Sequence, residues 1–333
     1  MGAGRIGHLH ARNIAVCGRA RIGSVYDTHA AAAEVLAHRH GAVAVDDADA
    51  VFDDPRIDAV FICSPTDTHV SFIERAARSG KAIFCEKPID LDYARVMSVV
   101  SLLEQFPVTF MTGFHRRFDA STRRIREHVD AGRIGDVEFM RVMARDPGPP
   151  PAAYVARSGG LFRDMMIHDL DLCRWLTGRE FTRVFARGFN LFDPGTEAEG
   201  DYDTATATLW DDRGFSVVLQ NSRRSNGGFD QRIEVMGSAA SVSMDNVPVT
   251  QTRLILPDGL KSDALPDHFP ERYAGAYVAQ LSEFLSAIEE KRQPITTAID
   301  GIAALQLADA CALSATEQSI VNIMPVARSR AAT

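Results

Sequence analysis

The chain has 333 residues, of which 46% are hydrophobic and 24% charged, and its formal net charge is −8. At about 150 residues per domain this length predicts two domains, and the composition excludes disordered, collagen-like and disulfide-scaffold proteins. The acidic balance gives no electrostatic reason to bind nucleic acid or an anionic membrane, and no apolar run reaches the ~18–20 residues of a membrane-spanning helix.

The first 115 residues alternate apolar runs typical of strands with segments typical of helices. We expect strands at 21–26, 42–45, 57–63, 82–85 and 108–114, and helices at 8–17, 30–39, 69–78 and 93–105. Repeated βα units with nearly continuous apolar strands predict a Rossmann-type, doubly wound parallel sheet. Residues 1–115 are therefore expected to form an α/β, dinucleotide-binding domain.

The pattern changes after residue 115. We expect helices at 118–131, 162–176, 273–290 and 299–316, a strand at 137–144, and further strands separated only by turns from 183 to 245. Strands in succession without helices predict a mainly antiparallel sheet with one open face. The second domain, residues 116–333, is thus expected to be α+β and to bind substrate and other subunits.

A glycine pattern opens the chain. Gly2-Ala3-Gly4-Arg5-Ile6-Gly7 fits G-x-G-x-x-G, in which the glycines permit a tight turn, close approach of a pyrophosphate and close helix packing. Asp27 ends the next strand, where a carboxylate accepts hydrogen bonds from the ribose hydroxyls and repels a 2′-phosphate. These residues predict NAD in preference to NADP. The alternative is an ordinary glycine turn with a surface aspartate.

A dinucleotide fold places a buried strand directly before its glycine loop. Met1 occupies the last position of that strand, and a strand usually has about 5–6 residues. We therefore expect the first strand to be missing or truncated in this sequence, and roughly that many residues to precede Met1 in the natural protein.

Two further loops follow apolar strands at the sheet edge where ligands bind. Ser64-Pro65-Thr66-Asp67-Thr68-His69 is expected to line the cofactor, although the same residues suit a helix N-cap. Cys85-Glu86-Lys87-Pro88 places a lysine near the nicotinamide, in an X-Pro bond that can be cis. Alone, this tetrapeptide would suit a surface strand end equally well.

One helix carries a polar stripe. Asp164, His168 and Asp171 are spaced by four and three residues, which puts them on one helical face. An aspartate one turn before a histidine can fix the imidazole tautomer and stabilise the imidazolium. The alternative is a solvated face, but the double glycine Gly159-Gly160 ahead and the apolar residues behind favour a buried functional face.

Together these patterns resemble the glucose-fructose oxidoreductase, inositol dehydrogenase and MocA (Gfo/Idh/MocA) superfamily, and within it the bacterial inositol 2-dehydrogenases. The motifs that carry the resemblance are the glycine loop with His10-Ala11-Arg12-Asn13, Cys85-Glu86-Lys87-Pro88, Gly113 to Asp119, Arg145-Asp146-Pro147, Ser158 to Asp164 with His168-Asp169, Asn221-Ser222-Arg223-Arg224 and Asp230 to Glu234. They span most of the chain in the order of the family.

The resemblance implies an NAD-dependent dehydrogenase of polyol catabolism that oxidises a CH–OH group, with myo-inositol giving 2-keto-myo-inositol (scyllo-inosose). It implies a catalytic set of Lys87, Asp164 and His168, with Arg117 and Asp171 binding the other hydroxyls of the polyol. The expected cofactor-binding residues are Gly2, Gly4, Arg5, Ile6, Gly7, Asp27, Ser64, Thr66, His69, Glu86 and Lys87. The resemblance also suggests a homotetramer built on the open sheet, whose outer face needs a covering partner.

Other functions stay open. Phe229 stands where the inositol branch is expected to carry a tyrosine, so the substrate could be scyllo- or chiro-inositol or a pyranose sugar. A non-catalytic NAD-binding regulator on the same fold is a further alternative, but it would have no need of Lys87 and His168. No metal is expected. The five scattered cysteines form no Cys-x-x-Cys pair and predict buried thiols in a reducing cytoplasm.

Overall fold

The computed structural model describes residues 1–326, which divide into two compact units. Unit 1 comprises Met1–Phe118, Gly275–Leu305 and, among the described residues, Val326, whereas unit 2 comprises Asp119–Ala274 and Gln306–Pro325. The sequence suggests that every residue after 115 lies in the second domain, but residues 275–305 return to unit 1. Aromatic packing holds this segment in unit 1, because the Phe284 ring contacts Phe61 and Phe84 at centroid distances of 5.4 and 5.9 Å.

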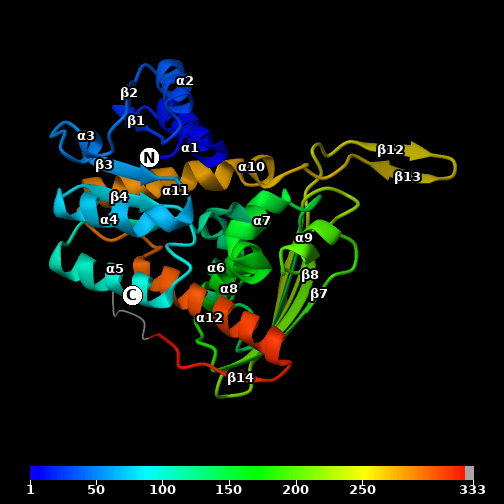
Figure 1. The fold of residues 1–333 in the computed structure, drawn as a ribbon. Coiled ribbons are helices and arrows are strands. Elements are labelled where there is room, and N and C mark those ends of the chain that lie inside the picture. The colour runs from blue at the N-terminus through cyan, green and yellow to red at the C-terminus, as the bar shows by residue number, and fades with distance from the viewer. Residues whose placement is uncertain (327–333) are drawn as a thin grey trace. The chain divides into compact units, whose positions relative to one another are not determined.

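Unit 1 contains two short parallel sheets (Figure 1). One pairs β1 with β2, and the other runs in the order β3-β4-β5; the strands are β1 (Ser24–Tyr26), β2 (Val43–Val45), β3 (Ala59–Ile62), β4 (Ala82–Cys85) and β5 (Phe110–Thr112). Met1 and Gly2 hydrogen-bond to both sheets. The Met1 ammonium donates to Phe61 O at 3.0 Å, Cys63 N donates to Met1 O at 2.8 Å, and Gly2 N donates to Tyr26 O at 2.8 Å.

The helices of unit 1 bury apolar faces against these strands. They are α1 (Arg5–Val16), α2 (Ala30–His40), α3 (Asp49–Phe52), α4 (His69–Arg78), α5 (Tyr93–Gln105) and α11 (Ala274–Glu289), with the start of α12 (Ala298–Glu317). Short 3-10 turns, η1 (Thr66–Thr68) and η2 (His115–Phe118), follow β3 and β5. The core includes Ile62, Ile73, Ile83, Val96 and Ile302, all of them 0% exposed. The expected Rossmann-type α/β domain is confirmed.

Unit 2 is built on a seven-stranded sheet in the order β11-β10-β6-β9-β8-β7-β14. Only the β6–β9 pair is parallel, so the expected mainly antiparallel sheet is confirmed. The strands are β6 (Val137–Arg145), β7 (Arg183–Phe189), β8 (Thr204–Trp210), β9 (Ser216–Ser222), β10 (Asp230–Gly237), β11 (Ser241–Met244) and β14 (Val321–Asn322). The helical segments are α6 (Ala120–Asp130), α7 (Ala152–Ser158), η3 (Phe162–Met166), α8 (Ile167–Thr177), α9 (Pro194–Ala198), α10 (Phe269–Arg272) and the rest of α12.

The two faces of this sheet differ in exposure. Burial alternates along β8 and β9, and the inner residues form one core with the helices, including Ala205, Leu219, Leu170 and Cys311 at 0% exposure. The outer face leaves apolar side chains in solvent, with Val218 at 37% and Met236 at 42% exposure. A hairpin of β12 (Arg253–Leu256) and β13 (Gly259–Ser262) projects from this unit (Figure 1) and was not expected from the sequence.

Helix α12 is long and apolar enough to cross a membrane by length and composition, but 67% of that stretch is buried inside the protein. Such burial is typical of a core helix. Three of the expected buried thiols, Cys85, Cys173 and Cys311, are buried, while Cys17 and Cys63 are only partly so.

Candidate active site

The glycine loop (residues 2–7) requires glycine at two positions for reasons visible in the backbone. Gly2 has a positive φ of 90°, and a Cβ there would lie 2.6 Å from the Cys63 carbonyl carbon and from Ser64 N. A Cβ at Gly7 would overlap the Gly2 carbonyl oxygen. At Gly4, by contrast, nothing lies within 4 Å of the Cβ position. Of these three glycines, only Gly4 therefore has open space at its Cβ position.

Helix α1 begins directly after this open position. Gly4 is its N-cap and supplies no side-chain acceptor, and the first turn carries no acidic residue. The N–H groups of a helix's first turn lack partners within the helix, and the helix dipole favours an anion there. A pyrophosphate at Gly4, Arg5, Ile6 and Gly7 suits this arrangement, so the residues present fit a dinucleotide.

Asp27 is tied to the glycine loop as well as to its own strand end. One carboxylate oxygen, Oδ2, accepts the Ala3 N–H at 2.6 Å, and Oδ1 accepts the His29 N–H at 2.8 Å. The side chain is half-buried beside β1. The carboxylate thus stands next to the loop, as a ribose-binding aspartate of a dinucleotide fold does.

The loop after β3 is held by its own side chains. Ser64 Oγ and Thr68 Oγ1 are hydrogen-bonded at 2.6 Å, and Thr66 begins the turn η1. His69 is buried, and its ring nitrogens lie 2.9 Å from the carbonyl oxygens of Pro88 and Ser64. Burial lowers the pKa of His69, and the two carbonyls oppose that effect. His69 therefore joins the loops after β3 and β4 through its ring.

The loop after β4 carries Lys87, and the Lys87–Pro88 bond is cis. The sequence does not reveal the contact that holds its neighbour: His10 Nε2 of α1 donates to Glu86 Oε1 at 2.8 Å. The two residues are 76 positions apart, so spacing along the chain cannot predict them as partners.

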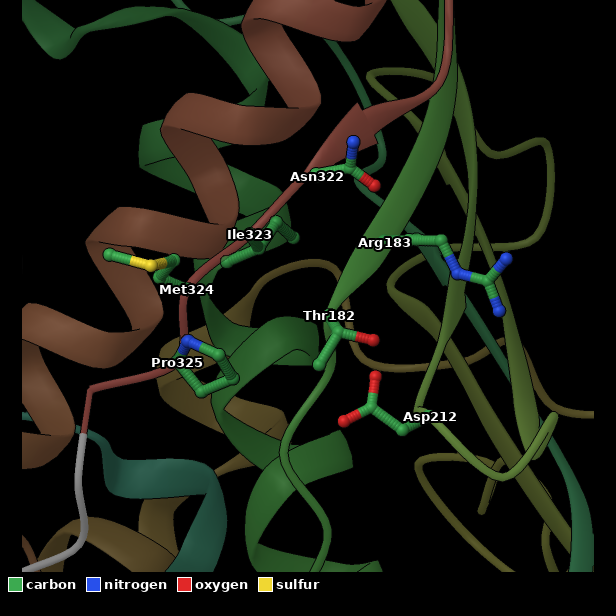
Figure 2. Close-up of a pocket in the computed structure, with 7 residues that line it drawn as sticks. All are labelled: Thr182, Arg183, Asp212, Asn322, Ile323, Met324 and Pro325. Atoms are coloured by element: carbon green, nitrogen blue, oxygen red, sulfur yellow. The ribbon is translucent and has the colours of Figure 1, made fainter.

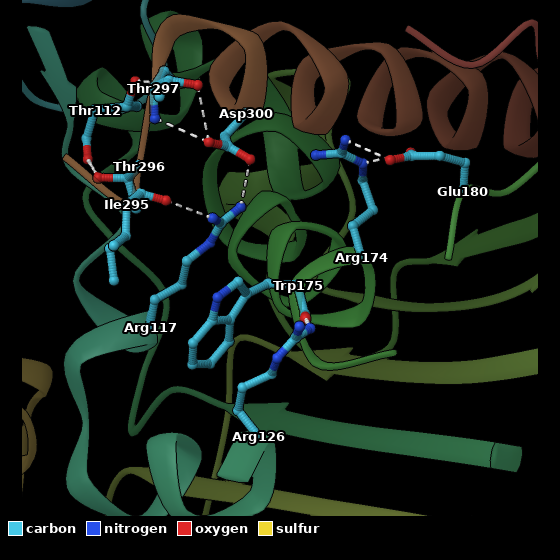
Figure 3. Close-up of polar contacts among 10 residues, drawn as sticks. All are labelled: Thr112, Arg117, Arg126, Arg174, Trp175, Glu180, Ile295, Thr296, Thr297 and Asp300. Atoms are coloured by element: carbon cyan, nitrogen blue, oxygen red, sulfur yellow. Dashed lines mark hydrogen bonds and ion pairs between the residues drawn. The ribbon is translucent and has the colours of Figure 1, made fainter. Parts of the chain in front are cut away.

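Arg117, expected to bind substrate, is buried and donates to Ile295 O at 2.9 Å and to Asp300 Oδ1 at 2.8 Å (Figure 3).

In unit 2, the segment with the polar stripe begins as a π-helix. Gly159 and Gly160, both at φ +83°, precede the π-helical turn Phe162–Met166, and α8 continues from Ile167. The helix expected over 162–176 is therefore present, but its first turn is π-helical and not α-helical. Asp164 lies in the π turn, whereas His168 and Asp171 lie in α8, both buried. π turns are frequent at functional sites.

Polar contacts from distant elements hold this segment. Asp201 Oδ1 accepts the Leu161 N–H at 2.8 Å, and Asp201 Oδ2 accepts from buried Arg223 at 2.8 Å. Asn221 Nδ2 donates to Asp169 Oδ2 at 2.7 Å. Tyr154, on α7, donates its hydroxyl to Asp164 Oδ1 at 2.9 Å. None of these partners is evident from the sequence, although Asn221 and Arg223 belong to a motif of the expected family.

Three further features bear on the site: the position of Phe229, a hollow in unit 2 and the arrangement of possible metal ligands. Phe229 is buried, and its ring is nearly perpendicular to that of Tyr273, with a centroid distance of 5.9 Å. A hollow of about 560 Å³ at the edge of the unit 2 sheet shares no residue with the expected site; it is lined by Thr182, Arg183, Asp212, Asn322, Ile323, Met324 and Pro325 (Figure 2). Within residues 1–326, no group of three or more His, Cys, Asp or Glu side chains could hold a metal ion.

The expected catalytic residues are thus divided between the units. Lys87 follows β4 of unit 1, whereas Asp164 and His168 share one helical segment of unit 2 with Asp171, which is expected to bind substrate. The expected cofactor-binding residues all belong to unit 1, on the loops after β1, β3 and β4 and at the start of α1.

Comparison with protein-family models matches both parts of the chain. Residues 1–114 match the oxidoreductase family with an NAD-binding Rossmann fold, and residues 122–243 match the GFO/IDH/MocA C-terminal domain.

Individual proteins match over nearly the whole length. The chain is 43% identical to an inositol 2-dehydrogenase of Rhizobium meliloti, covering 97% of this chain and 98% of the relative. Among solved structures, a myo-inositol dehydrogenase from Corynebacterium glutamicum is 39% identical, with a TM-score of 0.93 and 98% of each chain covered. A scyllo-inositol dehydrogenase from Lactobacillus casei, with bound NAD(H) and scyllo-inositol, is 32% identical, with a TM-score of 0.89 and 96% and 97% covered.

Proposed function

Because the chain belongs to the Gfo/Idh/MocA oxidoreductase family, we propose that it is an NAD-dependent dehydrogenase that oxidises myo-inositol to 2-keto-myo-inositol (scyllo-inosose). The observation that carries this proposal is the likeness to inositol dehydrogenases over almost the whole chain, in sequence and in fold. The lysine, aspartate and histidine that a hydroxyl oxidation needs are all present, as Lys87, Asp164 and His168.

The cofactor is NAD, held by the glycine loop and Asp27. The pyrophosphate would lie at Gly2, Gly4, Arg5, Ile6 and Gly7, and the Asp27 carboxylate would accept hydrogen bonds from the adenosine ribose and repel a 2′-phosphate. Ser64, Thr66 and Glu86 lie on loops at the same sheet edge, which His69 joins through its ring. When bound, NAD supplies a hydride acceptor at nicotinamide C4.

The protein's own residues would then accept the proton of the reacting hydroxyl and stabilise the charge that develops on its oxygen. His168 removes the proton of the reacting hydroxyl, and the Lys87 ammonium hydrogen-bonds the same oxygen. Asp164 orients these groups and balances the charge of the imidazolium that forms. Asp171 and Arg117 bind further hydroxyls of the ring. Arg117 would do so while its guanidinium also holds Ile295 and Asp300.

We further propose a cytoplasmic homotetramer. The outer face of the unit 2 sheet exposes Val218 and Met236, and the hairpin exposes Leu254, Ile255 and Leu260 at 54%, 80% and 59%. Apolar side chains left exposed in this way suit contact with another subunit.

A second candidate keeps the chemistry and changes the substrate. Phe229 carries no hydroxyl and is buried against Tyr273, which favours scyllo-inositol, chiro-inositol or a pyranose as an alternative to myo-inositol. The test is a spectrophotometric screen of NAD reduction across cyclitols and sugars, repeated with NADP. Fastest turnover of myo-inositol with NAD is expected. A clear preference for a pyranose would establish the alternative, and a preference for NADP would refute the role of Asp27.

A further inference from the structure

A largely buried hydrogen bond supports the loop that carries Lys87. His10 Nε2 lies 2.8 Å from Glu86 Oε1, and the side chains are 3% and 12% exposed. His10 comes from α1, the helix that begins at the glycine loop, and Glu86 directly precedes Lys87. The contact therefore joins α1 to the lysine-bearing loop within unit 1.

Glu86 occupies a tightly fitted position. Its second oxygen, Oε2, accepts the Lys87 backbone N–H at 3.3 Å, and the Glu86 N–H donates to Ile62 O at 3.0 Å. Gly113 packs against the same side chain: a Cβ there would lie 2.7 Å from Glu86 Oε2 and 3.0 Å from its Cα. The carboxylate thus lies between His10 and Gly113. Its Oε1 faces His10, and its Oε2 faces Gly113 and the Lys87 backbone N–H.

The surroundings of His10 are aromatic. Its ring centroid lies 5.5 Å from that of Phe61, 4.8 Å from Phe84 and 5.7 Å from Tyr277. In such a setting a hydrogen bond to a carboxylate is electrostatically stronger than in water. A buried carboxylate that loses its partner is costly and tends to move toward water or other donors. The position of Glu86, and of the residue that follows it, therefore depends on His10.

We propose that His10 is a positioning residue for Lys87, acting through the Glu86 carboxylate. This inference rests on the proposed function, in which the Lys87 ammonium contacts the reacting oxygen. His10 itself touches neither substrate nor the reacting atoms. Its effect is geometric, and a displacement of about 1 Å at a reacting group can lower a rate about 100-fold.

Two substitutions at one position separate this role from simple filling of space. In His10→Gln the amide nitrogen reaches about as far as the imidazole Nε2 and can still donate to Glu86, whereas the shorter amide in His10→Asn cannot. We expect His10→Asn to lower kcat about 10- to 100-fold with the NADH Kd and the substrate KM little changed, and His10→Gln to restore most of that loss. His38→Asn, at an exposed histidine of α2, is the matched control and should leave kcat unchanged.

A second variant and a second measurement keep the test decisive. Glu86→Gln should lower kcat to a similar degree, and combining it with His10→Asn should add little, because both changes remove one interaction. Labelling of Lys87 by an amine-reactive reagent, followed by peptide mass spectrometry, should change in rate in His10→Asn and return toward wild type in His10→Gln. This readout needs no turnover, so it tests the positioning role even if wild-type protein fails to oxidise any cyclitol.

Three results would overturn the proposal. They are equal losses of kcat in His10→Asn and His10→Gln, additive losses in the double variant, and Lys87 labelling that is the same in all the variants. Any of these would leave His10 as a packing residue of α1.

Discussion

Arg223 and Asp201 form an ion pair of 2.8 Å inside unit 2, with side-chain exposures of 1% and 8%. The other Asp201 oxygen accepts the Leu161 N–H, one residue before the π turn that contains Asp164. The pair therefore links the end of β9 to the start of the segment that carries the proposed catalytic aspartate and histidine.

Removal of Arg223 should destabilise the protein strongly, because it leaves the Asp201 carboxylate buried without its charged partner. Breaking a buried pair in this way costs about 3–5 kcal/mol. We expect Arg223→Met to lower the free energy of unfolding in urea by that amount, while Arg183→Met, at an exposed position of β7, changes it little. A loss no larger than that of the control would show that Asp201 finds another partner.

The proposed cofactor preference depends on Asp27. Asp27→Ala should weaken NAD binding about 10- to 100-fold, since hydrogen bonds to a charged group are worth about 1.5–3 kcal/mol. Binding of NADP should weaken less or improve, because the repulsion of the 2′-phosphate is gone. Fluorescence titration with NADH and NADPH measures both constants, and Asp58→Ala, at an exposed position before β3, is the control. An unchanged ratio of the two constants would contradict the role of Asp27.

Stability should fall as the pH is lowered below about 6.5, the ordinary pKa of histidine. Burial lowers the pKa of His69 and lowers that of His115 well below its usual value. At pH values between the folded and unfolded pKa, the unfolded chain binds more protons than the folded chain. The contribution of these two neutral histidines to the free energy of unfolding is therefore complete above about pH 6.5 and is lost as the pH falls.

His115→Phe tests the origin of that loss. His115 stacks on Tyr277 with a centroid distance of 4.5 Å, and a phenyl ring can keep this contact. We expect unfolding midpoints measured across this pH range to decline less in His115→Phe than in wild type or in His38→Phe. Parallel curves for all three proteins would assign the pH dependence to other groups.

The proposed tetramer can be tested on the outer face of the unit 2 sheet. Val218→Glu combined with Met236→Glu should shift the molecular mass in sedimentation experiments toward smaller assemblies, because charge is placed on a face that another subunit would cover. Val35→Glu on α2 is the matched control, since Val35 is 55% exposed on unit 1. An unchanged mass in the double variant would exclude this face as the interface.

Much of the fold is predictable because its signals are local. Helices α4 and α5 have the bounds expected for them, since Gly80 follows the first at φ +69° and Asp92 caps the second by accepting from Ala94 and Arg95 N–H groups. The helix expected from 162 is formed, but the sequence does not indicate that its first turn, residues 162–166, is π-helical. That turn follows a Leu161 N–H bound to Asp201, 40 residues away.

The candidate site shows the same division. Asp27 and Lys87 are identifiable because each follows a strand at a fixed place in a dinucleotide fold, and the glycine loop because it directly precedes the first helix. His10–Glu86 and Asp201–Arg223 are not, because their partners come together only in the folded chain. Helix α11 belongs to unit 1 for a similar reason: Phe284 meets Phe61 and Phe84, which are distant in sequence.

The most direct test of the proposed chemistry is the rate of NAD reduction with myo-inositol in Lys87→Ala and His168→Ala, measured beside their NADH dissociation constants. Loss of a positioned acid or base typically costs about 100- to 10,000-fold in rate. We expect losses in that range in both variants with cofactor affinity close to wild type. Near-normal turnover in both variants, with normal NADH binding, would contradict the assignment of Lys87 and His168 as catalytic residues.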